Sequence, residues 1–209
     1  MTTGNIKIIY DGPEDSAVTF VLAHGAGVPM DAPFMNCFAE GVAESGIRVA
    51  RFEFPYMQRQ RAEGKRIPPS SAAVLVERYL AVVGALGGGS RLVIGGKSLG
   101  GRIATLIANQ VEAKGVVCLG YPFHPPEKPE NTRIEYLKNI AASTLILQGA
   151  EDPFGSPDEV AEYGLPENVK VTWLDGGDHH LAMAGSSDAE NEQNWTEGAQ
   201  AIVEFINSL

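Results

Sequence analysis

The chain has 209 residues, of which 44% are hydrophobic and 20% are charged, a composition typical of one water-soluble globular domain. Its 26 acidic and 16 basic residues leave a formal net charge of −10, which disfavours nucleic acid as a partner because phosphate contacts depend on Lys and Arg. No apolar run reaches the roughly 18 residues that span a membrane, and the first residues lack a signal-peptide pattern. We therefore expect a single domain over residues 1–209 in the cytoplasm, with no membrane partner.

Apolar, β-branched runs alternate with amphipathic segments along the chain. Residues 17–25 predict a buried strand that ends in a glycine turn, and Asp31 is expected to cap the helix that follows. Residues 47–54 predict a second strand that Pro55 halts, and residues 58–66 a basic loop. The later elements are a helix over 68–89, a strand over 91–96, a helix over 99–115, strands over 115–122 and 143–149, a helix over 156–164, a strand over 169–177 and a helix over 191–209. Residues 5–12 predict an edge strand.

This alternation of strand and helix predicts an α/β fold with a mostly parallel sheet and helices on both faces. In such sheets ligands bind beyond the carboxyl ends of the strands. A functional side chain is therefore expected directly after a strand. The two cysteines, Cys37 and Cys118, lie inside a predicted helix and strand, and we expect them to be buried thiols without a disulfide or metal.

The glycine-rich segment Gly95–Arg102 follows one of these strands. A phosphate-binding P-loop would need a glycine where Arg91 stands, inside the strand, so this interpretation fails on spacing. The segment also contains the pattern Gly-x-Ser-x-Gly, centred on Ser98 between a strand and a helix. A nucleophile at such a sharp turn needs small neighbours, and the helix N-terminus offers N–H groups to an oxyanion. We therefore expect Ser98 to be a nucleophile.

A serine nucleophile needs a base, and the base needs an orienting acid. The four histidines, His24, His124, His179 and His180, all follow predicted strands, so position alone does not choose between them. Asp152 follows the strand predicted over 143–149, and His179 and His180 follow the next predicted strand, over 169–177. The order serine, aspartate, histidine is typical of α/β-hydrolase sheets.

Six motifs together give the chain a resemblance to a known superfamily. They are LAHGAGVPMDAPFM, RFEFPYM, GGKSLGGR, GYPFHPP, QGAEDPFG and GGDHHL, and they extend from residue 22 to residue 181. The chain resembles the α/β-hydrolases, and among them a compact bacterial branch related to the dienelactone hydrolases. The resemblance implies an α/β-hydrolase fold and a single α/β-hydrolase domain. Unlike larger relatives, the chain has no extended insertion between GYPF and STLILQG, so we expect no extended lid.

The resemblance also implies roles for individual residues. It matches Ser98 to the nucleophile, Asp152 to the orienting acid and His179 to the base, with His180 as the alternative base. The rival carboxylates Glu151, Asp175 and Asp178 are expected to be turn or cap residues.

The motif around His24 resembles an oxyanion loop. Its expected donors are the backbone N–H groups of Ala26, with Gly27 as an alternative, and of Leu99 after the nucleophile. His24 itself is expected to brace the loop by hydrogen bonding. Candidates for the substrate pocket are Met30, Tyr56, Lys97, Tyr121 and Phe123, with Phe34 and Met57 beside them.

The expected function is hydrolysis of a small carboxylic ester, thioester or lactone through an acyl-enzyme, with a small-molecule acyl substrate and no cofactor or metal. Two alternatives stay open: a non-catalytic interaction module on the same scaffold, and an acyltransferase that uses the same triad. The basic residues Arg59, Arg61, Lys65 and Arg66 form either a solvated loop or a rim that attracts anionic substrates.

Overall fold

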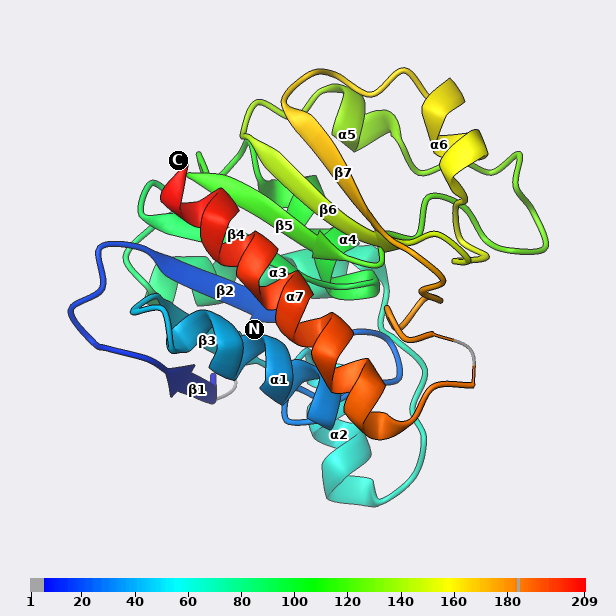
Figure 1. Cartoon of the computed structure of the whole chain (residues 1–209). Helices are drawn as coiled ribbons and strands as arrows, with labels where there is room; N and C mark the ends of the chain where they lie inside the picture. Colours follow the sequence, from blue (N-terminus) through cyan, green and yellow to red (C-terminus); the bar gives the residue numbers. More distant parts are fainter. Residues whose placement is uncertain (1–5, 184) are drawn as a thin grey trace.

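Seven strands form one sheet in a computed structural model that describes residues 6–183 and 185–209 (Figure 1). The strands are β1 (Ile8–Asp11), β2 (Thr19–Ala23), β3 (Arg48–Phe52), β4 (Leu92–Lys97), β5 (Gly115–Leu119), β6 (Thr144–Gly149) and β7 (Val169–Leu174). Their spatial order is β1-β3-β2-β4-β5-β6-β7. Only the edge strand β1 pairs antiparallel, with β3, and every other pair is parallel. The predicted α/β-hydrolase fold class is confirmed.

Helices cover both faces of this sheet. They are α1 (Pro33–Ala43), α2 (Pro55–Glu63), α3 (Ala72–Ala85), α4 (Leu99–Ile107), α5 (Glu135–Lys138), α6 (Pro157–Glu162) and α7 (Asp188–Asn207). The long helix α7 crosses one face beside α1, whereas α3 and α4 pack together on the other face (Figure 1). Because β5 and β6 are joined with only the short α5 between them, no extended helical lid lies over the sheet in the described residues.

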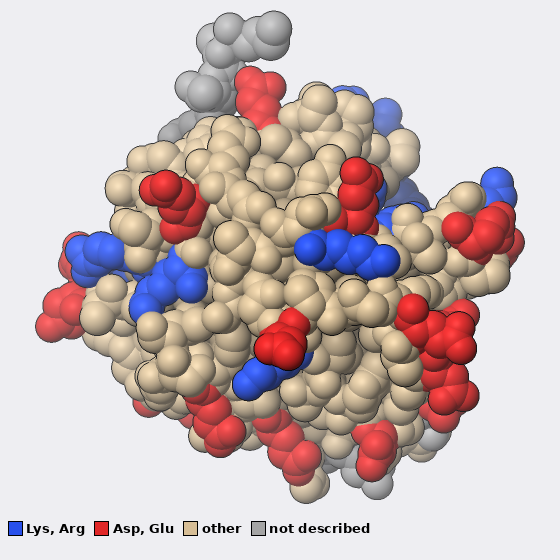
Figure 2. All heavy atoms as spheres, turned by 90° about the horizontal axis from the view of Figure 1, so that it is seen from above, with Lys and Arg blue, Asp and Glu red and all other residues tan. Residues whose placement is uncertain are grey.

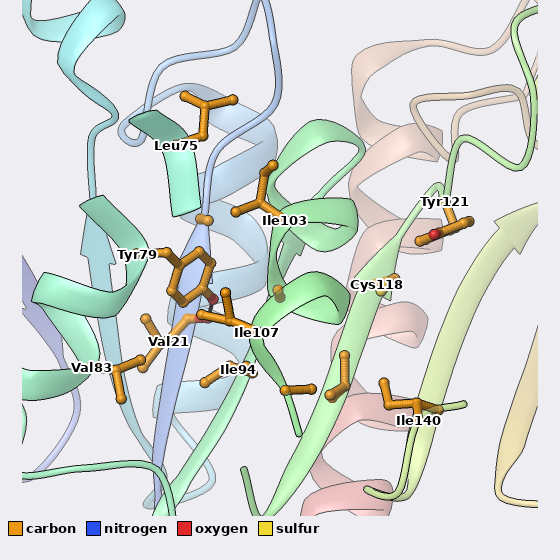
Figure 3. Packing of buried hydrophobic residues seen from close by; sticks show 14 of the residues in the cluster. Val21, Leu75, Tyr79, Val83, Ile94, Ile103, Ile107, Cys118, Tyr121 and Ile140 are labelled. Carbon is orange, nitrogen blue, oxygen red and sulfur yellow. Dashed lines mark hydrogen bonds between the residues drawn. The ribbon is translucent and has the colours of Figure 1, made fainter. Parts of the chain in front are cut away.

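Strand residues alternate between the two faces, as the pleat of a β-strand requires. Phe20 and Leu22 of β2 pack in the core beneath α1 and α7. Val21 and Ala23 of the same strand pack in the core beneath α3 and α4. Figure 3 shows this second core, in which Tyr79 of α3 lies next to Val21. Parallel strands buried on both faces explain why the sequence shows continuous apolar runs.

The hydroxyl of Tyr79 satisfies backbone groups inside this core. It accepts the N–H of Gly95 at 2.9 Å, and it lies 2.8 Å from the carbonyl oxygen of Gly95 and 3.1 Å from that of Val21. A buried hydroxyl is tolerated when it is hydrogen-bonded in this way. Tyr79 therefore joins α3 to the two central strands just before the turn that carries Ser98.

Four local expectations were wrong or incomplete, and two of them lie near a proline. The strand stops before Pro55 as expected, but Pro55 begins helix α2 where we expected a basic loop, because proline is well suited to the first helical position. Asp31 does not cap α1, whose N-cap is Ala32 and makes no side-chain cap hydrogen bond. Asp31 is paired with Arg61 instead. The helix expected over 99–115 ends at Ile107, and α5 was not expected.

The surface carries mixed charges. On the face drawn in Figure 2, basic side chains lie scattered among acidic ones and form no continuous basic area. Of the two cysteines, Cys118 is buried, Cys37 is partly exposed, and both are free thiols. None of the helices in the described part of the chain combines the length and the apolar character needed to cross a bilayer.

Candidate active site

Ser98 lies at the turn between β4 and α4 and has a backbone φ of 48°. This is a left-handed conformation that non-glycine residues rarely adopt. The flanking glycines allow it: a Cβ atom on Gly96 would lie 2.3 Å from the carbonyl oxygen of Ala23, and one on Gly100 would lie 2.6 Å from the same atom. The Ser98 N–H donates to the carbonyl of Leu119 at 2.9 Å. The Gly-x-Ser-x-Gly spacing is therefore a requirement of the close approach between β2 and this turn.

The three side chains that the sequence singled out form a hydrogen-bonded chain. His179 Nε2 lies 2.9 Å from Ser98 Oγ, and His179 Nδ1 lies 2.8 Å from Asp152 Oδ2. The Asp152 side chain is fully buried, whereas the His179 side chain is 16% exposed and so reachable from solvent. With the carboxylate accepting from Nδ1–H, Nε2 is left as an acceptor toward the serine hydroxyl. This geometry allows His179 to take a proton from Ser98.

The sequence analysis missed two residues that hold this chain in place. Gln148, at the end of β6, is fully buried and donates from Nε2 to Asp152 Oδ2 at 2.7 Å. Its Oε1 accepts the N–H of Tyr121 at 2.7 Å. The N–H of Phe154 donates to Asp152 Oδ1 at 2.9 Å, and the Phe154 ring lies 4.2 Å from the imidazole of His179. The sequence signal available for Gln148 was its polar side chain near the end of a mostly apolar strand.

The other histidines have different surroundings. His180 is exposed, and its ring centroid lies 6.0 Å from that of His179. His124 Nε2 lies 3.3 Å from a carboxylate oxygen of Glu159 on α6. Asp178 Oδ1 accepts the N–H groups of His180 and Ala182, as expected of a turn residue.

His24 joins the ends of β2 and β3. Its Nδ1 lies 2.7 Å from the carbonyl oxygen of Gly25, and its Nε2 accepts the N–H of Phe54 at 3.0 Å. Nδ1 therefore carries the proton of a neutral imidazole. Burial lowers the pKa of His24 from 6.5 to about 4, with the nearby charge of Arg61 acting in the same direction. The expected bracing of this loop by His24 agrees with these contacts.

The loop after His24 presents backbone N–H groups. The Tyr56 hydroxyl lies 3.2 Å from the carbonyl oxygen of Gly25 and 3.1 Å from that of Ala26, and so holds the carbonyl side of the loop. Among the hydrogen bonds of residues 6–183 and 185–209, the N–H groups of Ala26 and Leu99 have no acceptor. Free N–H groups at a helix N-terminus and an adjoining loop suit an oxyanion.

The residues expected to line a substrate pocket pack in the interior instead. Met30, Tyr56, Lys97, Tyr121 and Phe123 are each at most 3% exposed. None of them lines the cavity of about 660 Å³ beside the loop that follows His24. Its lining residues are Gly27, Pro29, Met57, Gln60, Arg61, Gly64, Lys65 and Arg66. Of the pocket candidates, only the neighbouring Met57 reaches this cavity.

Three residues of the basic cluster line this cavity, namely Arg61, Lys65 and Arg66, and most charges of the cluster are paired. Arg61 contacts Asp31 and Glu53, while Arg59 and Lys65 both contact Glu63. In the part of the chain that the structure describes, no group of three or more His, Cys, Asp or Glu side chains could hold a metal ion.

The chain matches the model of a known protein family. A family model for the alpha/beta hydrolase domain matches residues 16–207. Dienelactone hydrolase from Anabaena variabilis has a similar structure, with a TM-score of 0.72 and 21% identity, covering 95% of this chain and 89% of that one.

Two further solved structures resemble the chain. Est1E from Butyrivibrio proteoclasticus has a TM-score of 0.73 and 15% identity, covering 97% and 93% of the two chains. A protein from Xanthomonas campestris, described as an a/b serine hydrolase without lid, has a TM-score of 0.67 and 18% identity, covering 95% and 88%. At these identities, the likeness shows a shared fold.

Proposed function

The chain belongs to the alpha/beta hydrolase family, and on that basis we propose that it is a serine hydrolase acting on a small carboxylic ester, thioester or lactone. The observation that carries the proposal is the hydrogen-bonded chain from Ser98 through His179 to Asp152. A serine hydroxyl is a weak nucleophile unless a base is aligned to remove its proton. The strained φ of Ser98 is further support, because strain of this kind clusters at functional sites.

In the proposed mechanism, Ser98 Oγ attacks the carbonyl carbon while His179 Nε2 accepts the serine proton. Asp152 stays ionised and stabilises the imidazolium through Nδ1. The N–H groups of Ala26 and Leu99 donate to the oxyanion, and His179 returns the proton to the leaving oxygen or sulfur as the acyl-enzyme forms. Water then repeats the sequence, with His179 as its base, and releases the acid. His179 moves the proton in both half-reactions.

The class of bond that the protein cleaves is proposed from the geometry of the site and from the proteins of similar structure. One structural neighbour is a dienelactone hydrolase, which supports an ester-type bond in the substrate. We propose a small-molecule acyl substrate as the partner of the site, and the cytoplasm as its location. An acyltransferase would use the same residues with an alcohol or amine in place of water, and would form product only when such an acceptor is added.

A fluorophosphonate probe tests the proposal directly, because it reacts with activated serines. We expect the native chain to be labelled and Ser98→Ala to lose all labelling while its melting temperature stays within a few degrees. Unlabelled native protein would then be assayed with esters, thioesters and lactones, because the probe blocks the Ser98 hydroxyl that turnover requires. If the folded native chain is not labelled, the site is not an activated serine, and the interaction-module alternative replaces the proposal.

A further inference from the structure

Lys97 places an amine in the protein interior next to the nucleophile. It is the last residue of β4 and directly precedes Ser98, yet it is only 1% exposed. Among the described residues, no carboxylate lies within ion-pairing distance of its amine. A buried amine without a carboxylate partner is unfavourable to folding compared with an apolar side chain of similar length. The proposed chemistry assigns this amine no proton to move.

The backbone around Lys97 leaves a defined path for its side chain. A Cβ atom on Gly25 would lie 3.1 Å from Lys97 Cγ, and one on Gly120 would lie 2.8 Å from Lys97 Nζ. The Phe34 ring centroid lies 5.7 Å from Nζ, within the range of a cation–π contact. Two glycines and one aromatic ring therefore enclose the side chain along its length.

The amine of Lys97 contacts the main chain of His179, the candidate base. Lys97 Nζ donates to the carbonyl oxygen of His179 at 2.5 Å. The next residue on the same strand end, Ser98, contacts the imidazole of His179 at 2.9 Å. His179 is thus held to the end of β4 at two points, its backbone by Lys97 and its ring by Ser98. Asp152, from the loop after β6, holds the ring at a third point.

We propose that Lys97 is a positioning residue that fixes the backbone of His179 and thereby aligns its imidazole with Ser98. The inference rests on the proposed serine hydrolase function. Lys97 and Ser98 are adjacent at the end of one strand. The hydrogen bond from Lys97 to the His179 carbonyl therefore resists any movement of the His179 backbone that would separate His179 Nε2 from Ser98 Oγ. A misplacement of about 1 Å at a catalytic group can lower a rate about 100-fold, so a backbone tether at this point has a large effect on turnover.

The electrostatics agree with this assignment. Burial lowers the pKa of Lys97 from 10.5 to about 7, while the carboxylates of Asp152 and Asp178 act in the opposite direction. The fold therefore tolerates an amine whose charged form is disfavoured where it lies. An apolar replacement removes that penalty together with the tether, so stability and activity should change in opposite directions.

Lys97→Met tests the inference, because methionine is unbranched, apolar and of nearly the same length. We expect kcat for a small neutral ester to fall about 10- to 100-fold with KM changed less than about twofold, while the melting temperature is unchanged or higher. Unchanged kcat would overturn the inference. A fall in melting temperature together with activity would indicate a structural role only.

A double-mutant cycle keeps the test valid if Lys97→Met proves unstable. In a His179→Ala background the tether has nothing to align, so adding Lys97→Met should lower the residual rate less than twofold. An equal loss in both backgrounds would refute positioning through His179. Failure of the proposed function is distinguishable, because the native chain would then show neither fluorophosphonate labelling nor ester turnover, and the Lys97 inference would fall with it.

Discussion

His179 and His180 are neighbours in the chain but have different partners. His179 contacts both Ser98 and Asp152, whereas His180 is exposed and its backbone carbonyl accepts the indole N–H of Trp195 at 3.0 Å. Asp178 Oδ1 accepts the N–H of His180 and so fixes the turn in which the two imidazoles have different surroundings. Only the first of the two imidazoles is in position to act on the serine hydroxyl.

We therefore expect His179→Ala to lower kcat/KM for a small ester by about 10²- to 10⁴-fold, the usual contribution of a general base. His180→Ala should change it less than about threefold. Steady-state kinetics on both variants, with melting temperatures recorded alongside, provide the measurement. If His180→Ala is the more damaging of two equally stable variants, the base has been assigned to the wrong residue.

The sequence predicted these side chains unequally well. Ser98 is marked by glycines that the close approach of Ala23 requires, so a local pattern was sufficient. The preference for His179 over His180 came from the resemblance to α/β-hydrolases, because both follow the same strand. Gln148 was missed, since one amide at a strand end gives no pattern. Tyr121 and Phe123 looked like pocket residues because an aromatic side chain after a strand can pack inward or face a ligand equally well.

Helix α2 shows where reasoning from local signals fails. The segment is polar, and Pro55 reads as a strand terminator, but the same proline starts the helix. The helix ends at Glu63, and the next residue, Gly64, has a φ of 65° that turns the chain toward Lys65 and Arg66. These two residues then line the cavity that also touches Gly27 of the candidate oxyanion loop. The basic segment is consequently divided, with Arg59 on the helix and Arg66 at the cavity.

This division changes which residue should attract an anionic substrate. Among the described residues, Arg66 has no carboxylate within ion-pairing distance, while Arg61 is held by Asp31 and Glu53. We expect Arg66→Ala to raise KM for an ester bearing a carboxylate by about two- to fivefold at low salt, the range of an exposed ion pair. KM for a neutral ester of the same size should not change.

Arg59→Ala is the matched control, because Arg59 does not line the cavity and its partner is Glu63, 3.5 Å away on the same helix. It should leave both KM values unchanged. An equal rise for neutral and anionic esters in Arg66→Ala would show that the residue shapes the cavity without recognising charge.

The arrangement of the whole sheet was predictable because the same physical rules apply to each of its strands and helices. Each buried strand gives an apolar run, each covering helix gives a periodic pattern, and parallel neighbours need crossovers on both faces. What could not be predicted is how distant loops lock together at the carboxyl edge. Contacts such as His24 with Phe54, or Lys97 with His179, join residues 30 and 82 positions apart and depend on side-chain directions.

His24 links the stability of the entire fold to pH. Its pKa is about 4 in the folded chain and 6.5 in the unfolded chain, so the unfolded chain binds a proton first as the pH falls. The stability that neutral His24 contributes is complete above pH 6.5 and is lost between pH 6.5 and 4. From pH 7 to pH 5 this linkage amounts to about 2 kcal/mol of unfolding free energy.

We expect His24→Gln, which cannot titrate, to be less stable than the native chain at pH 7 but to lose about 2 kcal/mol less between pH 7 and pH 5. Urea denaturation at the two pH values measures both differences. The depressed pKa of Lys97 mostly affects the range between about 7 and 10.5, so it contributes little in this window. Parallel losses in the two proteins would mean that His24 is not held neutral by the fold, and that His24 braces the candidate oxyanion loop more weakly than its two hydrogen bonds indicate.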